Sequence, residues 1–213
     1  MKTDQLIGLL ATDVPAVPRD AAARRLGLAL GAALPLSAAG MLAGYGLRPD
    51  LAQVLSLPMF WIKLAFPLCI AAAAFAIVQR LARPGVPVRR GWTGLAAPVL
   101  LLWALALVVW FGAPAADRAP MFWGLSWRGC IANIALLALP FFVAVFLALR
   151  GLAPTRPALA GAAAGALAGG LGAAVYALHC QELAAPFLAV WYVAGIALPT
   201  VVGAGLGQRL LRW

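Results

Sequence analysis

Two short motifs carry the side chains of this chain whose chemistry is most distinctive. Cys130 ends the motif SWRGC, and Cys180 lies at the centre of LHCQE, where His179 and Glu182 stand close to it. Outside a reducing cytosol, two thiols can form a permanent disulfide or act as a redox switch. With His179 and Glu182 they also offer the sulfur, nitrogen and oxygen ligands of a soft metal ion. These residues leave all three interpretations open.

The composition indicates that membrane helices must position these thiols. Of the 213 residues, 65% are hydrophobic and only 10% are charged, whereas a soluble domain is about half apolar and a quarter charged. The chain is therefore predicted to be an integral membrane protein. Its net charge of +10 does not predict nucleic-acid binding, because the basic residues flank apolar runs, as membrane topology requires.

Six apolar stretches are long enough to cross a bilayer, which takes about 20 residues of helix. They lack the two-residue alternation of a barrel strand, so the sequence predicts an all-α integral membrane protein with six transmembrane helices. The predicted spans are Leu26–Leu47, Pro58–Leu81, Trp92–Gly112, Cys130–Leu149, Pro157–Leu178 and Pro186–Gly207.

The basic residues predict the orientation of these spans. Cytoplasmic loops of membrane proteins are enriched in Lys and Arg. With both termini cytoplasmic, the inner face carries Lys2, Arg19, Arg24, Arg25, Arg80, Arg83, Arg89, Arg90, Arg150, Arg156, Arg209 and Arg212, and the outer face carries Arg48, Lys63, Arg118 and Arg128. This topology places Cys130 and Cys180 together on the outer face. A signal peptide with its apolar core at Leu26–Leu36 and its cleavage site at Ser37-Ala38-Ala39 is disfavoured, because the basic leader is long and the apolar run continues to Leu47.

Glycines recur every fourth residue in the fifth stretch, at Gly161, Gly165 and Gly169. Small residues at this spacing let two helices approach closely in a membrane. Tight packing within the bundle is the favoured interpretation, and a homodimer through the same face is the alternative.

The predicted spans are poor in groups for transport or catalysis. They contain no Asp or Glu, and Lys63 is the one ionisable group well inside a span, from which it is expected to extend to the lipid headgroups. Cys69 is expected to pack as a small apolar residue. No phosphate-binding loop, catalytic triad or HExxH motif is present. The chain is therefore not expected to be an enzyme. A metal or small-solute permease, and a structural membrane subunit with a permanent disulfide, are two functions that these residues leave open.

The N-terminal sequence TDQLIGLLA predicts a short helix, with Thr3 as its N-cap and Asp4 near its positive end. Leu6, Ile7 and Leu10 form one apolar stripe. So short a helix needs a surface to bury that stripe, and both the membrane surface and a groove on a cytoplasmic protein remain open. A tether containing Pro15 and Pro18 follows. The sequence thus divides into an N-terminal binding segment, 1–25, and a transmembrane part, 26–213.

Taken together, these motifs resemble the NrsF-like membrane anti-sigma factors of proteobacteria. The resemblance rests on TDQLIGLLA, on PMFWIK at the second span, and on the two cysteine motifs with the PF and WY pairs that follow the second. It covers essentially the whole chain. Ile131 and Ala184 stand where the family often has Pro and Ser.

The resemblance implies a multi-pass protein of the bacterial inner membrane that holds an extracytoplasmic-function sigma factor inactive. It further implies that the outer thiols sense heavy-metal or oxidative stress and that release follows. The thiols concerned are Cys130 and Cys180. The sigma-binding residues would be Thr3, Asp4, Leu6, Ile7 and Leu10. No cofactor would be required, although a thiophilic metal ion could bind the thiols. A shift of the fourth span against the fifth, conveyed through the connection 150–156, is the expected signal route.

Overall fold

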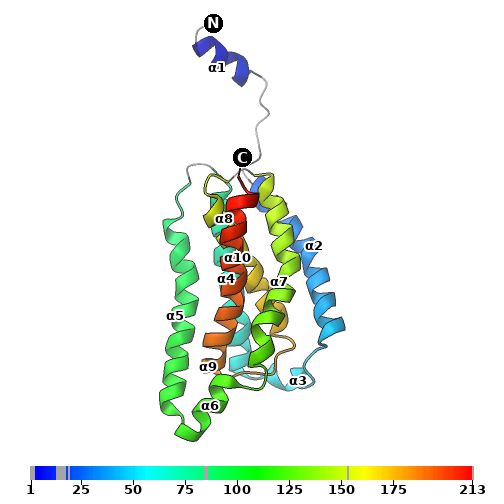
Figure 1. Ribbon diagram of the computed structural model, residues 1–213, viewed down its shortest axis with the longest axis vertical. Coiled ribbons are helices and arrows are strands. Elements are labelled where there is room, and N and C mark those ends of the chain that lie inside the picture. Colours follow the sequence, from blue (N-terminus) through cyan, green and yellow to red (C-terminus); the bar gives the residue numbers. More distant parts are fainter. Residues whose placement is uncertain (1–2, 13–17, 19, 84–85, 153, 213) are drawn as a thin grey trace.

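The computed structural model describes residues 3–12, 18, 20–83, 86–152 and 154–212, and Lys2, Pro15 and Arg19 of the predictions above fall outside these ranges. Figure 1 shows long helices side by side in one bundle, with a short helix beyond one end. The elements are α1 (Thr3–Ala11), α2 (Ala21–Gly44), α3 (Leu51–Val54), α4 (Pro58–Leu81), α5 (Arg89–Gly112), α6 (Ala115–Trp123), α7 (Trp127–Arg150), α8 (Pro157–Tyr176), α9 (Ala185–Phe187), the π-helical turn η1 (Leu188–Tyr192) and α10 (Val193–Leu210).

Six segments of the described chain are long and apolar enough to span a membrane: α2, α4, α5 from Gly91 onward, the run from α6 through α7, α8, and the continuous run α9–η1–α10. The predicted all-α class with six spans is confirmed. Some boundaries differ from those expected. The first span ends at Gly44, because Gly46 adopts a positive φ of 73° that leaves the helix, a conformation that glycine adopts without steric cost. Within the fourth, helix α7 begins at Trp127, three residues earlier than expected.

Helix α8 is the centre of the bundle, and 78% of the residues in its most apolar stretch are buried. Most of its residues are Ala or Gly, so neighbouring helices can approach its backbone. A Cβ added to Gly161 or Gly165 would collide with main-chain atoms of α10, and one on Gly169 would meet Ile196. The predicted glycine face is therefore covered by a helix of the same chain, and a homodimer would need a different surface.

Helices α2 and α5 lie at the outside of the bundle. Of the six spans, their most apolar stretches have the smallest share of buried residues. Helix α2 packs mainly on α7, where Ser37 Oγ donates a hydrogen bond to Leu137 O at 2.8 Å. Cys69, in α4, is exposed on the bundle surface. Hydropathy does not mark the buried face of α4, because this helix is apolar all round, so the sequence did not indicate on which side of the helix Cys69 lies.

The two ends of the bundle differ. Helices α3, α6 and α9 gather at one end, and the C-terminus and α1 lie at the other (Figure 1). Cys130 is in the first turn of α7, and Cys180 is in the connection that follows α8. Both thiols belong to the end that carries α3 and α6, which is called the cysteine end below.

Candidate functional site

Cys130 and Cys180 come together at the cysteine end. Both are buried free thiols in one apolar cluster, and they lie close enough to interact electrostatically. Local hydrogen bonds position them: the N–H of Cys130 donates to Ser126 O, and the N–H of Cys180 donates to Tyr176 O and extends the last turn of α8. Two residues fifty positions apart thus share one small region.

Two buried cations hold the segment that carries Cys180. Arg48, 3% exposed, donates from Nη1 to Cys180 O at 3.1 Å and from Nη2 to Gln181 O at 3.3 Å. Lys63, 1% exposed, donates from Nζ to Cys180 O at 2.5 Å and to Glu182 O at 2.8 Å. Three consecutive carbonyl groups are therefore bound by side chains from the connection after α2 and from α4.

The expectation that Lys63 extends to the lipid headgroups was wrong. Its ammonium group points into the bundle, where it donates hydrogen bonds to the carbonyl groups of Cys180 and Glu182 and lies 5.4 Å from the centre of the Tyr192 ring. A lysine extends to the headgroups when the membrane interior offers it no partner. Here the connection after α8 supplies partners, so the charge stays buried.

The charge of Arg48 is compensated and that of Lys63 is not. Both oxygens of Asp50 accept from Arg48, at 2.7 Å from Nε and 2.9 Å from Nη2. These bonds hold the pKa of Asp50 below its ordinary value and raise the pKa of Arg48. In the described part of the chain, no carboxylate forms an ion pair with Lys63. The site therefore retains one buried positive charge without a negative partner.

His179 and Glu182 anchor the connection after α8. His179 Nδ1 hydrogen-bonds Gly46 O at 3.0 Å, and its ring lies 5.3 Å from that of Tyr45. Glu182 Oε1 accepts from the N–H groups of Leu125 and Ser126 at 2.6 and 3.3 Å. Within the described ranges, no three His, Cys, Asp or Glu side chains are grouped closely enough to hold a metal ion. His179 and Glu182 thus face other partners, and metal binding, one of the three interpretations that the sequence leaves open, stays a prediction for the two thiols.

Several site residues were missed by sequence reasoning. Tyr45 Oη donates to Asn133 Oδ1 at 3.0 Å, and Asn133 Nδ2 lies 3.4 Å from Tyr176 Oη, which links α2, α7 and α8. An asparagine in the first turns of an otherwise apolar span was the available signal. Tyr192 is fully buried beside Lys63, and its hydroxyl has no hydrogen-bond partner among the described residues.

A polar cavity of about 490 Å³ opens at the cysteine end. Cys180 lines it and Cys130 does not. Ser126 Oγ lies 4.0 Å from Cys180 Sγ. The cavity is lined by Asp50, Leu125, Ser126, Tyr176, His179, Cys180, Gln181 and Glu182. Both cysteines are buried, Cys130 at 0% and Cys180 at 2% exposure, and Cys180 is the one of the pair that belongs to the cavity wall.

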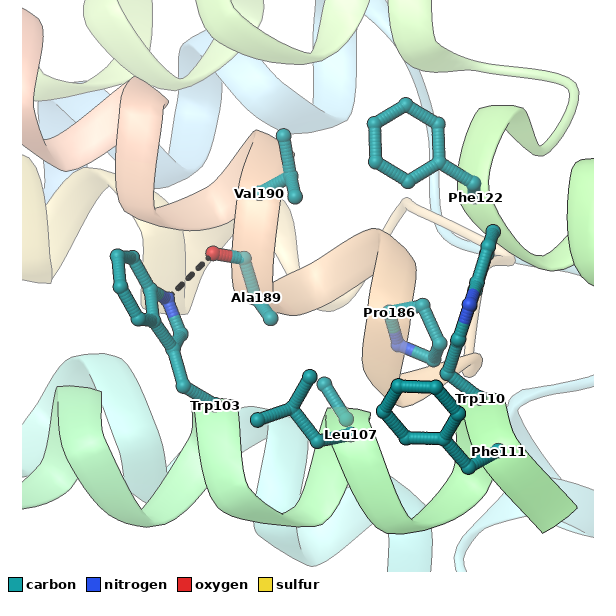
Figure 2. Close-up of a pocket in the computed structure, with 9 residues that line it drawn as sticks. Trp103, Leu107, Trp110, Phe111, Phe122, Pro186, Ala189 and Val190 are labelled. Atoms are coloured by element: carbon teal, nitrogen blue, oxygen red, sulfur yellow. Dashed lines mark hydrogen bonds between the residues drawn. The ribbon is translucent and has the colours of Figure 1, made fainter.

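A second cavity, of about 420 Å³, lies between α5, α6 and the η1 turn and is lined almost entirely by apolar side chains. Figure 2 shows the indole of Trp103 reaching across it and donating to Ala189 O at 2.9 Å. A π-helical turn shifts the regular pattern of main-chain bonds, and here Trp103 binds a carbonyl of that turn. The same turn carries Tyr192 on its buried side. This cavity offers no reactive group.

The N-terminal segment is helical, as expected, but Thr3 is its first helical residue rather than the residue before the helix. No residue of α1 is buried. The side chains of Leu6, Ile7 and Leu10 are between 43% and 68% exposed. Helix α1 therefore presents an uncovered apolar stripe.

Comparison with known proteins places the chain in a family. The family model described as negative regulator of sigma F matches residues 10–213. The chain belongs to the NrsF family. A relative from Azospira oryzae, described as a probable anti-sigma-F factor NrsF, is 45% identical over 213 residues, which cover all of both chains. The anti-sigma-F factor NrsF of Caulobacter vibrioides is 40% identical over 215 residues, again covering both chains completely.

Membership of the NrsF family confirms the resemblance drawn from the motifs and indicates a regulatory rather than a catalytic role. The matched range of the family model includes both cysteines and both buried cations, and it begins within α1. No solved structure is significantly similar to the chain.

Proposed function

We propose that this chain is an inner-membrane anti-sigma factor that holds an extracytoplasmic-function sigma factor of the sigma F type. Release would follow when Cys130 and Cys180 are oxidised or bind a thiophilic metal. The observation that carries the proposal is the meeting of these two thiols, in a chain of the negative-regulator family, at the end of the bundle opposite α1. The excess of Lys and Arg around α1 and the C-terminus supports a cytoplasmic α1 and periplasmic thiols.

Helix α1 is the proposed sigma-binding element. Its stripe of Leu6, Ile7 and Leu10 is uncovered in the free chain, and an amphipathic helix of this kind binds by laying its apolar side in a groove. Each of these side chains contributes about 1.5–3 kcal/mol when fully buried. Thr3 and Asp4 lie in the first turn, where they would orient the helix against the sigma factor.

Helix α2 is the proposed link between the thiols and α1. It follows α1 in the chain, and its far end is attached to the Cys180 segment by Arg48 N to Leu178 O at 3.1 Å and by His179 to Gly46 O. Disulfide or metal–thiolate formation would move Cys180 and strain these attachments. At the other end of α2, Arg25 Nη1 lies 3.4 Å from Gly151 O, so a movement of α7 against α8 would reach the same helix.

The required coupling is modest. To change the sigma factor from 99% bound to 99% free, the binding free energies of the reduced and the modified chain must differ by about 5.5 kcal/mol. A disulfide contributes about 2–4 kcal/mol and a structural metal–thiolate site contributes more. Modification of the thiol pair is thus of the right order to release most of the sigma factor.

Co-purification from cells tests this function. The chain from unstressed cells should retain a sigma factor and lose it after exposure of the cells to peroxide or cadmium. Cys130→Ser and Cys180→Ser should retain it under both conditions. Cys69→Ser is the matched control and should release like the unaltered chain, because Cys69 lies on the bundle surface away from the site. Absence of any sigma factor, or release from both serine variants, would reject the proposal.

A further inference from the structure

The two thiols of the pair differ in access. Cys180 lines the polar cavity at the cysteine end and lies 4.0 Å from Ser126 Oγ. Cys130 is fully buried in the first turn of α7 and contributes nothing to the cavity wall. Cys180 is itself only 2% exposed, but it is the one of the two cysteines that lies beside a dissolved reagent in the cavity.

The two thiols also share an unusual neighbour. The ammonium group of Lys63 is bonded to the carbonyl oxygen of Cys180 and interacts electrostatically with both thiols. Carbonyl groups solvate a buried ammonium ion but do not cancel its charge, and an unpaired buried charge is costly. Asp50 is bound to Arg48, and the carboxylate of Glu182 accepts from main-chain N–H groups of Leu125 and Ser126.

Tyr192 lies against Lys63 and Tyr176 lies next to Tyr192, and neither tyrosine supplies the missing charge. Tyr192 presents its ring to Nζ, and the hydroxyl of Tyr176 faces Asn133. A phenol is neutral near pH 7, whereas a thiol ionises more readily. The thiol of Cys180 is therefore the group best placed to become the negative partner of Lys63.

We propose that Lys63 is a positioning residue that makes Cys180 the attacking thiol of the pair and leaves Cys130 as the resolving thiol. This inference rests on the proposed function and assigns a different task to each cysteine. The ammonium group fixes the Cys180 carbonyl, and it stabilises the negative charge on Cys180 sulfur once the thiol has lost its proton.

With a peroxide as oxidant the two steps balance. The Cys180 thiolate attacks one peroxide oxygen, so that an S–O bond forms, the O–O bond breaks and the departing oxygen takes up a proton. Cys180 is thereby oxidised to a sulfenic acid, while the peroxide is reduced. The sulfur of Cys130 then attacks the sulfur of Cys180. An S–S bond forms, the S–O bond breaks, and the hydroxyl leaves as water with the proton of Cys130.

Single-thiol chains test the order of reaction. Full-length protein carrying Cys69→Ser is purified in detergent with either Cys130→Ser or Cys180→Ser added, and alkylation by iodoacetamide is followed by mass spectrometry. Cys180 should react at least about ten times faster than Cys130. Equal rates, or faster reaction of Cys130, would overturn the proposal. Both chains keep Lys63, so this comparison decides the order even where a Lys63 variant fails to fold.

Lys63 variants test the role of the charge. In the chain that keeps only Cys180, Lys63→Met should slow alkylation at least about tenfold, whereas Lys63→Arg should restore the rate to within about threefold of the parent. A Met variant that melts normally and reacts at the parent rate would refute the role of Lys63. The alkylation rates are measured without a sigma factor. Rates that contradict the role of Lys63 would therefore not contradict sigma release, and a failed co-purification would not contradict the proposed order of thiol reaction.

Discussion

The cysteine end and the N-terminal helix differ in how their residues are held. At the cysteine end, side chains from α4, α7, α8, η1 and the connection after α2 converge, and Arg48 and Lys63 bind the carbonyl groups of a segment more than a hundred residues away. In α1 no residue is buried. Substitutions at the cysteine end should therefore lower the stability of the folded bundle. Substitutions in α1 should leave that stability unchanged and alter only the binding of a partner.

The largest expected effect is a loss of sigma binding by α1. Leu6→Asp combined with Ile7→Asp should weaken sigma binding at least about a hundredfold, because two side chains worth about 1.5–3 kcal/mol each no longer bury. The melting temperature of the bundle should not change, since both residues are exposed. Co-purification and a thermal melt in detergent measure the two properties.

The matched control for this pair adds the same charge to the opposite side of α1. Gln5→Asp combined with Gly8→Asp should leave sigma binding within about threefold, because these positions lie away from the apolar stripe. Equal loss of binding in both double variants would show that the negative charge, and not the stripe, is responsible.

The second effect concerns the packing that supports the cysteine end. Gly165→Val should destabilise the bundle by about 3 kcal/mol, because the new side chain would meet main-chain atoms of Pro199 and Thr200 in α10. Gly205→Val, on the open side of α10 with no heavy atom near its added Cβ, should melt close to the parent. If both variants melt alike, the close approach of α8 and α10 is not structural.

A smaller loss is expected where the Cys180 segment joins the end of α2. Arg48→Met should cost about 2 kcal/mol of unfolding free energy, because it removes charged hydrogen bonds to two carbonyl groups and leaves Asp50 unpaired. Arg128→Met, at an exposed arginine of the same end, should cost less than about 1 kcal/mol. Denaturation in detergent mixtures compares the two. A loss no greater for Arg48→Met than for Arg128→Met would show that Arg48 does not hold the segment.

The smallest effect is a dependence on pH. Arg48 holds the pKa of Asp50 below its ordinary value, so this ion pair stabilises the folded chain fully above about pH 4 and loses its contribution as the pH falls further. The difference in melting temperature between the parent and Asp50→Asn should therefore shrink on acidification. A difference that stays constant from neutral to acidic pH would mean that the ion pair contributes nothing.

The positions of the spans and the shared end of the thiols could be read from the sequence, but their partners could not. The partners of Lys63 are main-chain carbonyl groups more than a hundred residues away. Every residue has such a carbonyl group, so no residue type marks those that accept. The surface position of Cys69 was equally hidden, because an apolar helix in lipid has similar side chains on its buried and lipid-facing sides.

The sequence alone determined how many times the chain crosses the membrane and that both cysteine motifs lie at one end. Hydrocarbon offers no hydrogen-bond partners, so each long apolar run must satisfy its own backbone as a helix. Only the tertiary structure decided that Arg48 and Lys63 are buried against the Cys180 segment and that Cys180, rather than Cys130, lines a cavity. Those outcomes depend on helix packing, which brings together groups that are distant in the chain.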